Sequence, residues 1–249
     1  MAPPRILVLK TGTTFPGTRR RFGDYDRWFM DALRECNVRF ESRDVTCSPP
    51  PPFTDYQGVL ITGSPASVSD DPEWLGPLKE ALREAVRQQR TPVLAVCFGA
   101  QVLASALGGR VVRNPRGWEM GTVRVRRTEA GREDRLLGAE ADAVSFQATH
   151  QDIIEALPGD AVVLAGNRMC PIQAFRMGAQ VWGMQFHPEM SPAILEDLLR
   201  ARRELLEATA GGSSEYLALL AGLGQTPKGR ELLVRFVELS GRFQNQQSP

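Results

Sequence analysis

Residues 92–109, with the sequence PVLAVCFGAQVLASALGG, decide the fold of this chain. The apolar run 92–97 has the length and composition of a buried strand, and the residues that follow it continue as a helix. That helix ends at the pair Gly108–Gly109, because glycine commonly terminates helices. A buried strand that leads directly into a helix is the repeating unit of α/β proteins, so this stretch predicts a sheet covered by helices.

The residues that precede this stretch repeat the same pattern. We expect strands at 5–10, 38–45 and 58–63, and amphipathic helices at 24–36 and 72–89. Near-continuous apolar strands that alternate with helices indicate an α/β fold with a mostly parallel central sheet and helices on both faces.

The residues after 110 have a different sequence pattern. Short, closely spaced β-type runs fill 110–186 and predict a small antiparallel portion added to the main sheet. Ser191–Pro192 predicts a helix start, and further helical runs follow at about 214–223 and 227–240. We expect the tail from 240 onward to be frayed. The predicted division is a main domain over 1–200 and a C-terminal helical extension over 201–249 that packs on it.

Composition excludes several classes of protein. The chain has 249 residues, 42% of them hydrophobic and 24% charged, which excludes wholesale disorder. A net charge of +1 favours neither a nucleic-acid nor a membrane partner. Four widely spaced cysteines and two histidines predict no metal site. The sequence shows no signal peptide and no apolar run of the ~20 residues that a membrane span requires, so we expect a cytoplasmic protein with reduced thiols.

Cys97 is the strongest candidate for chemistry because it stands at the junction of the predicted strand and helix. A sharp turn at this place exposes a nucleophilic side chain, and the small residues Ala95 and Gly99 permit such a turn. The helix dipole stabilises negative charge on the sulfur, and the backbone N–H of Phe98 faces the position where an oxyanion would form. The alternative interpretation is an ordinary buried cysteine in the core.

Two further segments complete a possible site. His187 and Glu189 follow the apolar run 180–186, where a histidine can act as general base and a carboxylate can fix its tautomer. The loop 61–67 follows another predicted strand, and its backbone N–H groups, Ser64 above all, are candidates for an oxyanion hole. Each segment taken alone is also compatible with an ordinary surface pair or turn.

Together these motifs resemble the class I glutamine amidotransferase domain. The cysteine at a turn, the downstream His187-Pro188-Glu189 and the upstream Gly63-Ser64-Pro65 occur in the family's order. The resemblance covers residues 5–200 and is closest to the glutaminase domain of GMP synthetases and to free-standing relatives that include γ-glutamyl peptidases. Further matches are Gln101, Trp118–Gly121, Thr149–Asp152 and Cys170–Phe175.

The resemblance implies a flavodoxin-like fold and a Cys-His-Glu triad. It implies hydrolysis of the glutamine side-chain amide through a γ-glutamyl thioester, with ammonia released for a separate synthase and without a cofactor. The implied residues are Cys97, His187 and Glu189 for catalysis, Ser64 and Phe98 for the oxyanion hole, and Gly63, Gln101, His150 and Gln151 for substrate binding.

Two positions depart from the family pattern, and the substrate stays open. Ala95 replaces a usual glycine of the turn, and Ser64 replaces a usual glycine of the loop, where it would make a peptide flip costlier. The same chemistry serves a γ-glutamyl peptidase that acts on glutathione-like substrates, since only the leaving group differs. A catalytically silent regulatory protein is a third possibility, although the presence of Cys97, His187 and Glu189 weighs against it.

Overall fold

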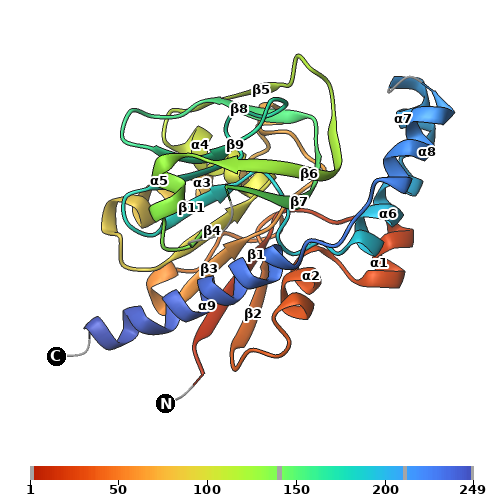
Figure 1. Ribbon diagram of the computed structural model, residues 1–249. Helices are drawn as coiled ribbons and strands as arrows, with labels where there is room; N and C mark the ends of the chain where they lie inside the picture. Colours follow the sequence, from red (N-terminus) through yellow and green to blue (C-terminus); the bar gives the residue numbers. More distant parts are fainter. Residues whose placement is uncertain (1–2, 139–141, 210–211, 248–249) are drawn as a thin grey trace.

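A central sheet organises the computed structural model, which describes residues 3–138, 142–209 and 212–247 (Figure 1). In this part of the chain the sheet has nine strands in the order β2-β1-β3-β4-β11-β10-β9-β6-β7. In that order the strands are β2 (Arg39–Asp44), β1 (Arg5–Lys10), β3 (Gly58–Ile61), β4 (Val93–Val96), β11 (Val181–Met184), β10 (Ala174–Met177), β9 (Val162–Gly166), β6 (Glu119–Arg127) and β7 (Ala143–His150).

The sheet divides into a parallel and an antiparallel part. The ladders from β2 through β1, β3 and β4 to β11 are all parallel. The ladders from β11 through β10, β9 and β6 to β7 are antiparallel. Every residue of β3, β4 and β11 is buried, as expected for strands covered on both faces. The prediction of a mostly parallel sheet with an added antiparallel portion is confirmed.

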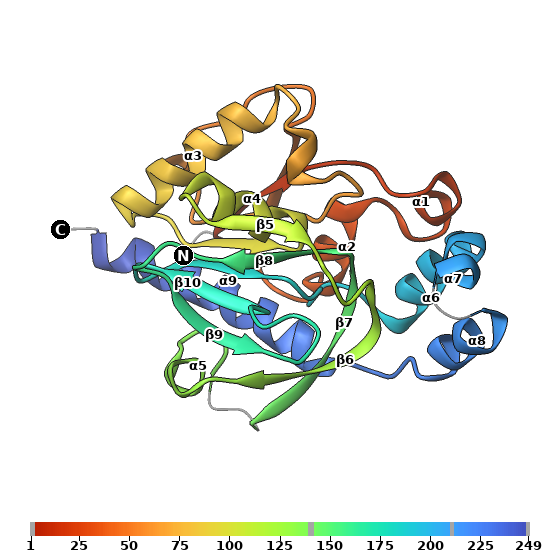
Figure 2. The ribbon, with the colours of Figure 1, turned by 90° about the horizontal axis from the view of Figure 1, so that it is seen from above.

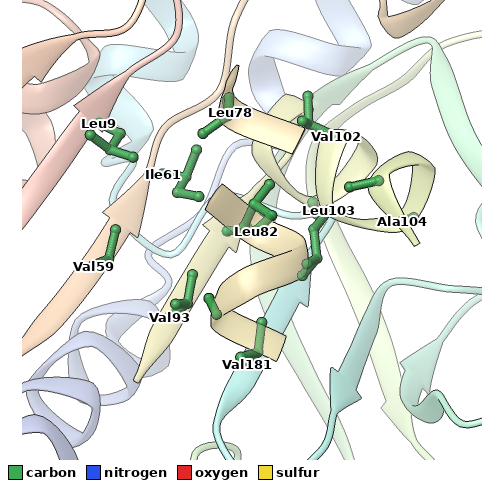
Figure 3. Close-up of a cluster of buried hydrophobic side chains, with 14 of the residues drawn as sticks. Leu9, Val59, Ile61, Leu78, Leu82, Val93, Val102, Leu103, Ala104 and Val181 are labelled. Atoms are coloured by element: carbon green, nitrogen blue, oxygen red, sulfur yellow. The ribbon is translucent and has the colours of Figure 1, made fainter. Parts of the chain in front are cut away.

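Alternate residues of the parallel strands face opposite layers of helices. Leu9, Ile61 and Val93 belong to one apolar cluster with residues of α3 (Leu75–Gln88) and α4 (Phe98–Ala106), part of which Figure 3 shows in close-up. Their neighbours along the strands pack against α2 (Tyr25–Ala32) and α9 (Pro227–Gln247) on the other face. Figure 2 shows α3 and α9 on opposite sides of the sheet. The period of two along each strand therefore builds two cores from one sheet.

Some local elements differ from the sequence prediction. The helix expected over 24–36 is α2, which begins after Asp24, whose side chain accepts a hydrogen bond from the Tyr25 N–H, and ends at Ala32. The elements that were not predicted include α1 (Pro16–Phe22), α5 (Glu129–Glu133) and β8 (Asp152–Ala156). The short, arginine-rich α1 has no apolar face, and β8 follows β7 after Gln151 alone and pairs with β5 (Arg110–Arg113) in a separate small sheet.

The C-terminal helices pack in two places (Figure 1). The side chain of Ser191 caps α6 (Pro192–Ala201), as predicted from the sequence. Helices α7 (Arg203–Thr209) and α8 (Ser213–Ala221) share a third apolar cluster with α6, and α9 lies across the sheet. Helix α9 continues through Gln247, so the expectation of a frayed tail is wrong for 240–247. Residues 248–249 lie outside the described residues. The division at residue 200 stays a prediction.

No helix in the described stretches is both long and apolar enough to cross a membrane.

Candidate functional site

Cys97 occupies a strained turn between β4 and α4. Its φ of 51° and ψ of −108° put a non-glycine residue in a sparsely populated backbone region, and such strain is concentrated at functional sites. The turn is held from both sides, because the Cys97 N–H donates to the Met184 carbonyl at 2.7 Å and the Gln101 N–H donates to the Cys97 carbonyl at 3.0 Å. The sulfur is therefore presented at the N-terminus of α4.

Close packing of α4 on the neighbouring strand β3 explains why residue 99 is a glycine. A Cβ at Gly99 would lie 2.9 Å from the Ile61 carbonyl oxygen and 3.1 Å from that of Thr62, so a larger residue would push the helix away. The turn forms with Ala95 in place of the usual glycine, as the sequence predicted. The sharp turn at Cys97 is therefore kept despite this departure from the family pattern.

His187 and Glu189 form a buried pair beside the cysteine. The His187 Nδ1 lies 2.6 Å from a Glu189 carboxylate oxygen, and both side chains are buried. The backbone N–H of His187 donates to the Gln147 carbonyl at 2.8 Å, which fixes the segment after β11 against β7. A Cβ placed on Gly63 would lie 3.0 Å from the His187 Cε1 and 3.5 Å from the Cys97 Cβ. The imidazole and the cysteine thus flank the same glycine, which must stay small.

The electrostatics of this pair favour a protonated imidazole. Burial lowers the pKa of His187, but the Glu189 carboxylate and charge on Cys97 outweigh burial and raise this pKa to about 10. The imidazole Nε2 has no hydrogen-bond partner among the described residues. His187 can therefore hold a proton at neutral pH on the side that the thiol and a substrate would use.

A cavity of about 120 Å³ opens in front of Cys97. We call it the site cavity. It is lined by Ser64, Pro65, Ala66, Ser67, Cys97, Phe98, Gln101, Arg113, Trp118, Thr149, His150, Gln151, Asp152 and Arg202. The structure thus brings six of the predicted site residues to one cavity: Ser64, Cys97, Phe98, Gln101, His150 and Gln151. Gly63, His187 and Glu189 do not line the site cavity.

The peptide between Gly63 and Ser64 has a fixed orientation. The Gly63 carbonyl accepts a hydrogen bond from the Thr62 hydroxyl at 2.9 Å, and the Thr11 hydroxyl lies at the same distance. In a trans peptide the N–H points opposite to the carbonyl, so these contacts also fix the direction of the Ser64 N–H. A flip of this peptide would break both contacts.

Gln185 is a site residue that the sequence prediction missed. Its side-chain N–H donates to the Cys97 sulfur at 3.7 Å, and its side-chain oxygen accepts from Gln101 at 3.3 Å. Gln101 also donates to the Asp152 carbonyl at 3.0 Å, so its amide hydrogens are engaged within the protein. The position of Gln185, two residues before His187 on the same segment, was the available signal.

A second buried cluster lies on the antiparallel side of the molecule. We call it the inner cluster: Glu119, His150 and Cys170, whose potential ligand atoms all lie within 4.8 Å of one another. The His150 Nε2 is 2.9 Å from a Glu119 oxygen, while Asn167 and Gln173 donate hydrogen bonds to the Glu119 carboxylate. These side chains could reach one metal ion, but amide donors already engage the carboxylate. The absence of a metal site stays a prediction.

Comparisons with known proteins point to one family. The family model of glutamine amidotransferase class-I matches residues 22–201. γ-Glutamyl peptidase 3 of Arabidopsis thaliana is 27% identical over 189 residues, which cover 73% of this chain and 75% of that protein. One of the subunits of the glutamine-hydrolyzing GMP synthase of Picrophilus torridus is 31% identical over 140 residues, which cover 56% of this chain and 70% of that protein.

Solved structures show the same fold. A glutamine amidotransferase from Methylobacillus flagellatus superposes with a TM-score of 0.74 at 24% identity, covering 98% of this chain and 95% of that one. A glutamine amidotransferase from Thermotoga maritima gives a TM-score of 0.71 at 22% identity, covering 96% and 97%. The resemblance seen in the sequence is thus confirmed, and the chain belongs to the class I glutamine amidotransferase family.

Proposed function

We propose that this protein hydrolyses a γ-glutamyl amide bond with Cys97 as the nucleophile, His187 as the general acid and base, and Glu189 as the residue that orients His187. One observation carries the proposal. A cysteine held at φ 51° at a helix N-terminus lines a cavity and is adjacent to a buried His–Glu pair with a 2.6 Å contact. This is the arrangement in which a thiol is activated for acyl transfer.

The first half of the reaction forms a thioester. His187 holds the proton of the Cys97 thiol as an imidazolium, and the Cys97 thiolate attacks the δ-carbonyl carbon of the γ-glutamyl group. Negative charge develops on the carbonyl oxygen, where the backbone N–H groups of Ser64 and Phe98 stabilise it. The C–N bond breaks as His187 returns its proton to the departing nitrogen, which leaves as ammonia or as an amine.

The second half releases glutamate. His187 accepts a proton from water, the resulting hydroxide attacks the thioester carbon, and the sulfur leaves as a thiolate. Glu189 balances the charge on the imidazolium in both halves, and the Gln185 N–H stabilises the negative sulfur. Side chains and backbone groups of the chain carry every step, so the proposed reaction calls on no cofactor.

For the leaving group, the leading proposal is ammonia from glutamine, passed to a separate synthase. The similarity to one of the subunits of a glutamine-hydrolyzing GMP synthase supports it. The second candidate is a γ-glutamyl peptidase, and it is supported by the match to γ-glutamyl peptidase 3 over 73% of this chain and 75% of that protein. The two functions share the thioester chemistry and differ in what departs from it.

The test measures glutamate, ammonia and amine release by the purified chain from glutamine and from glutathione. Cys97→Ala should abolish turnover, whereas Cys47→Ala, at an exposed free cysteine, should retain it. Faster turnover of glutathione would establish the peptidase, and turnover of glutamine alone would establish the amidotransferase. Full activity of Cys97→Ala, or no turnover of either substrate together with no alkylation of Cys97, would contradict the proposed chemistry and favour a silent regulatory protein.

A further inference from the structure

The positively charged side chain of Arg202 lines the site cavity. Arg202 caps the C-terminal end of α6 and lines the same cavity as Cys97. The guanidinium lies over two aromatic rings, with its carbon 5.1 Å from the centre of the Phe15 ring and 5.9 Å from that of Trp118. One of its N–H groups donates to the Thr149 hydroxyl at 3.1 Å. The guanidinium plane is thereby held by packing and by one hydrogen bond.

This cation has no carboxylate partner in the part of the chain that the structure describes. Arg202 forms no ion pair with any Asp or Glu that the structure describes. Arg113, which lines the same cavity, differs, because its guanidinium lies 3.2 Å from an Asp152 oxygen. The acidic groups that face Arg202 are Tyr25 and Cys97, and burial raises the pKa of Tyr25 to about 12, which keeps that phenol neutral.

A desolvated cation without a carboxylate partner is costly, and burial lowers the pKa of Arg202 accordingly. Such a group is retained where a ligand supplies the opposite charge. A guanidinium has five N–H donors, and a single bond to Thr149 leaves donors for a planar, two-oxygen acceptor. Carboxylates fit this fork, and the aromatic faces of Phe15 and Trp118 suit Arg better than Lys.

We propose that Arg202 binds a carboxylate of the γ-glutamyl substrate in the cavity next to Cys97. This inference rests on the proposed function and adds a specificity residue to it. The shared chemistry has two sources. Every γ-glutamyl substrate carries an α-carboxylate, and a glutathione-like substrate carries a second carboxylate at the far end of its leaving group.

The first experiment measures KM and kcat of Arg202→Gln, Arg202→Lys and Arg203→Gln. The substrates are glutamine, glutathione and glutathione with its glycine carboxylate converted to the amide. Loss of a charge-assisted pair should raise KM on the order of 10²-fold in Arg202→Gln, with a smaller change in kcat. Arg203→Gln removes the same charge one residue away, where Arg203 is exposed and paired with Glu207, and should leave KM within about twofold.

The substrates distinguish the two sources. An equal rise in KM for all three substrates would mean that Arg202 binds the α-carboxylate. If KM rises for glutathione but not for its amide or for glutamine, Arg202 binds the carboxylate of the leaving group. An unchanged KM of folded Arg202→Gln for all three substrates would overturn the proposal, and Arg202→Lys, which keeps the charge but lacks the fork, should show an intermediate KM.

A second readout works without turnover and separates this inference from the proposed function. Glutarate should slow alkylation of Cys97 by iodoacetamide in the wild-type protein, whereas its uncharged diamide should not. The protection by glutarate should be lost in Arg202→Gln. Equal protection by glutarate and its diamide would overturn carboxylate binding, whether or not the protein hydrolyses any of the substrates.

Discussion

The molecule contains two buried groups of one cysteine, one histidine and one glutamate, and they differ instructively. The elbow cluster consists of Cys97, His187 and Glu189, and the inner cluster consists of Cys170, His150 and Glu119. Both have a histidine nitrogen within 3 Å of a carboxylate, at 2.6 Å in the elbow cluster and 2.9 Å in the inner cluster. Composition and proximity are therefore nearly equal, and they do not separate a reactive site from an inert one.

The backbone and the surroundings of each cysteine make the difference. Cys97 stands in a strained turn at a helix N-terminus and faces a cavity. The Cys170 thiol donates to the Ile172 carbonyl at 3.3 Å, and burial, together with the Glu119 carboxylate, raises the pKa of this thiol far above its ordinary value. A neutral, buried thiol is a poor nucleophile, so the inner cluster is expected to support structure.

The carboxylates differ in the same sense. Glu119 accepts hydrogen bonds from Asn167 at 2.6 Å and from Gln173 at 2.7 Å, which is the environment of a structural anchor. The second oxygen of Glu189 has no hydrogen-bond partner among the described residues, so its charge acts on His187 with little competition. The elbow cluster keeps its charge available for chemistry, and the inner cluster uses its charge within the fold.

The largest expected effect separates the two cysteines. Cys97→Ser should lower γ-glutamyl turnover on the order of 10³-fold or more, because loss of the nucleophile disables the whole reaction unit. Cys170→Ser should keep turnover within about twofold, since a serine hydroxyl can donate to the same Ile172 carbonyl. Mass mapping after iodoacetamide treatment should find Cys97 modified and Cys170 unmodified in the native protein. Modification of Cys170 before Cys97 would contradict the assignment.

A second pair of variants compares the glutamates through the pH dependence of kcat/KM. The leaving group needs the protonated form of His187, and Glu189 raises the pKa of that residue, so Glu189→Gln should lower this pKa. The alkaline limb of the profile should then move down by about 1–3 pH units. Glu119→Gln should leave the limb in place. It should also lower the free energy of unfolding by roughly 1–3 kcal/mol, since a glutamine cannot accept both amide donors as a carboxylate does.

The same pKa shift has a consequence for stability with a definite sign. A histidine whose pKa is higher in the folded than in the unfolded state stabilises the fold when protonated. The contribution of His187 is complete below its unfolded pKa of ~6.5 and is lost as pH rises through about 10. Urea unfolding between these pH values should show a smaller decline in Glu189→Gln than in wild type. An equal decline would mean that Glu189 does not hold the proton on His187.

The sequence predicted the elbow cluster but not the inner cluster, for a physical reason. Cys97 and His187 follow apolar strands, so period and turn chemistry along the chain place them at one edge of a parallel sheet. His150 was predicted as a substrate contact, whereas its pairing with Glu119 depends on the register of β6 and β7, which local periodicity does not determine. Arg202 and Thr149 meet through helix packing, and nothing in either segment alone indicates that contact.

The smallest expected effect concerns the Gly63–Ser64 peptide, which lies next to Cys97 of the elbow cluster. Thr62→Val removes the hydroxyl that donates to the Gly63 carbonyl while it nearly preserves side-chain shape, so the Ser64 N–H loses part of its fixed direction. Loss of an oxyanion donor costs ~10²–10³ in rate, and a donor that is retained but loosened should cost roughly tenfold in kcat, with KM little changed.

The matched control for this variant is Thr91→Val. Thr91 is also buried, and its hydroxyl also donates to a backbone carbonyl, that of Phe53 at 3.1 Å, away from the site cavity. Each variant leaves one buried carbonyl with fewer donors, and Thr62→Val should lose more stability because it also removes the acceptor of the Thr11 N–H at 3.1 Å. A kcat that falls in Thr62→Val alone would show that peptide orientation next to Cys97 adds to the reactivity of the elbow cluster. Equal kcat in the two variants would mean that the nucleophile and the His–Glu pair suffice without it.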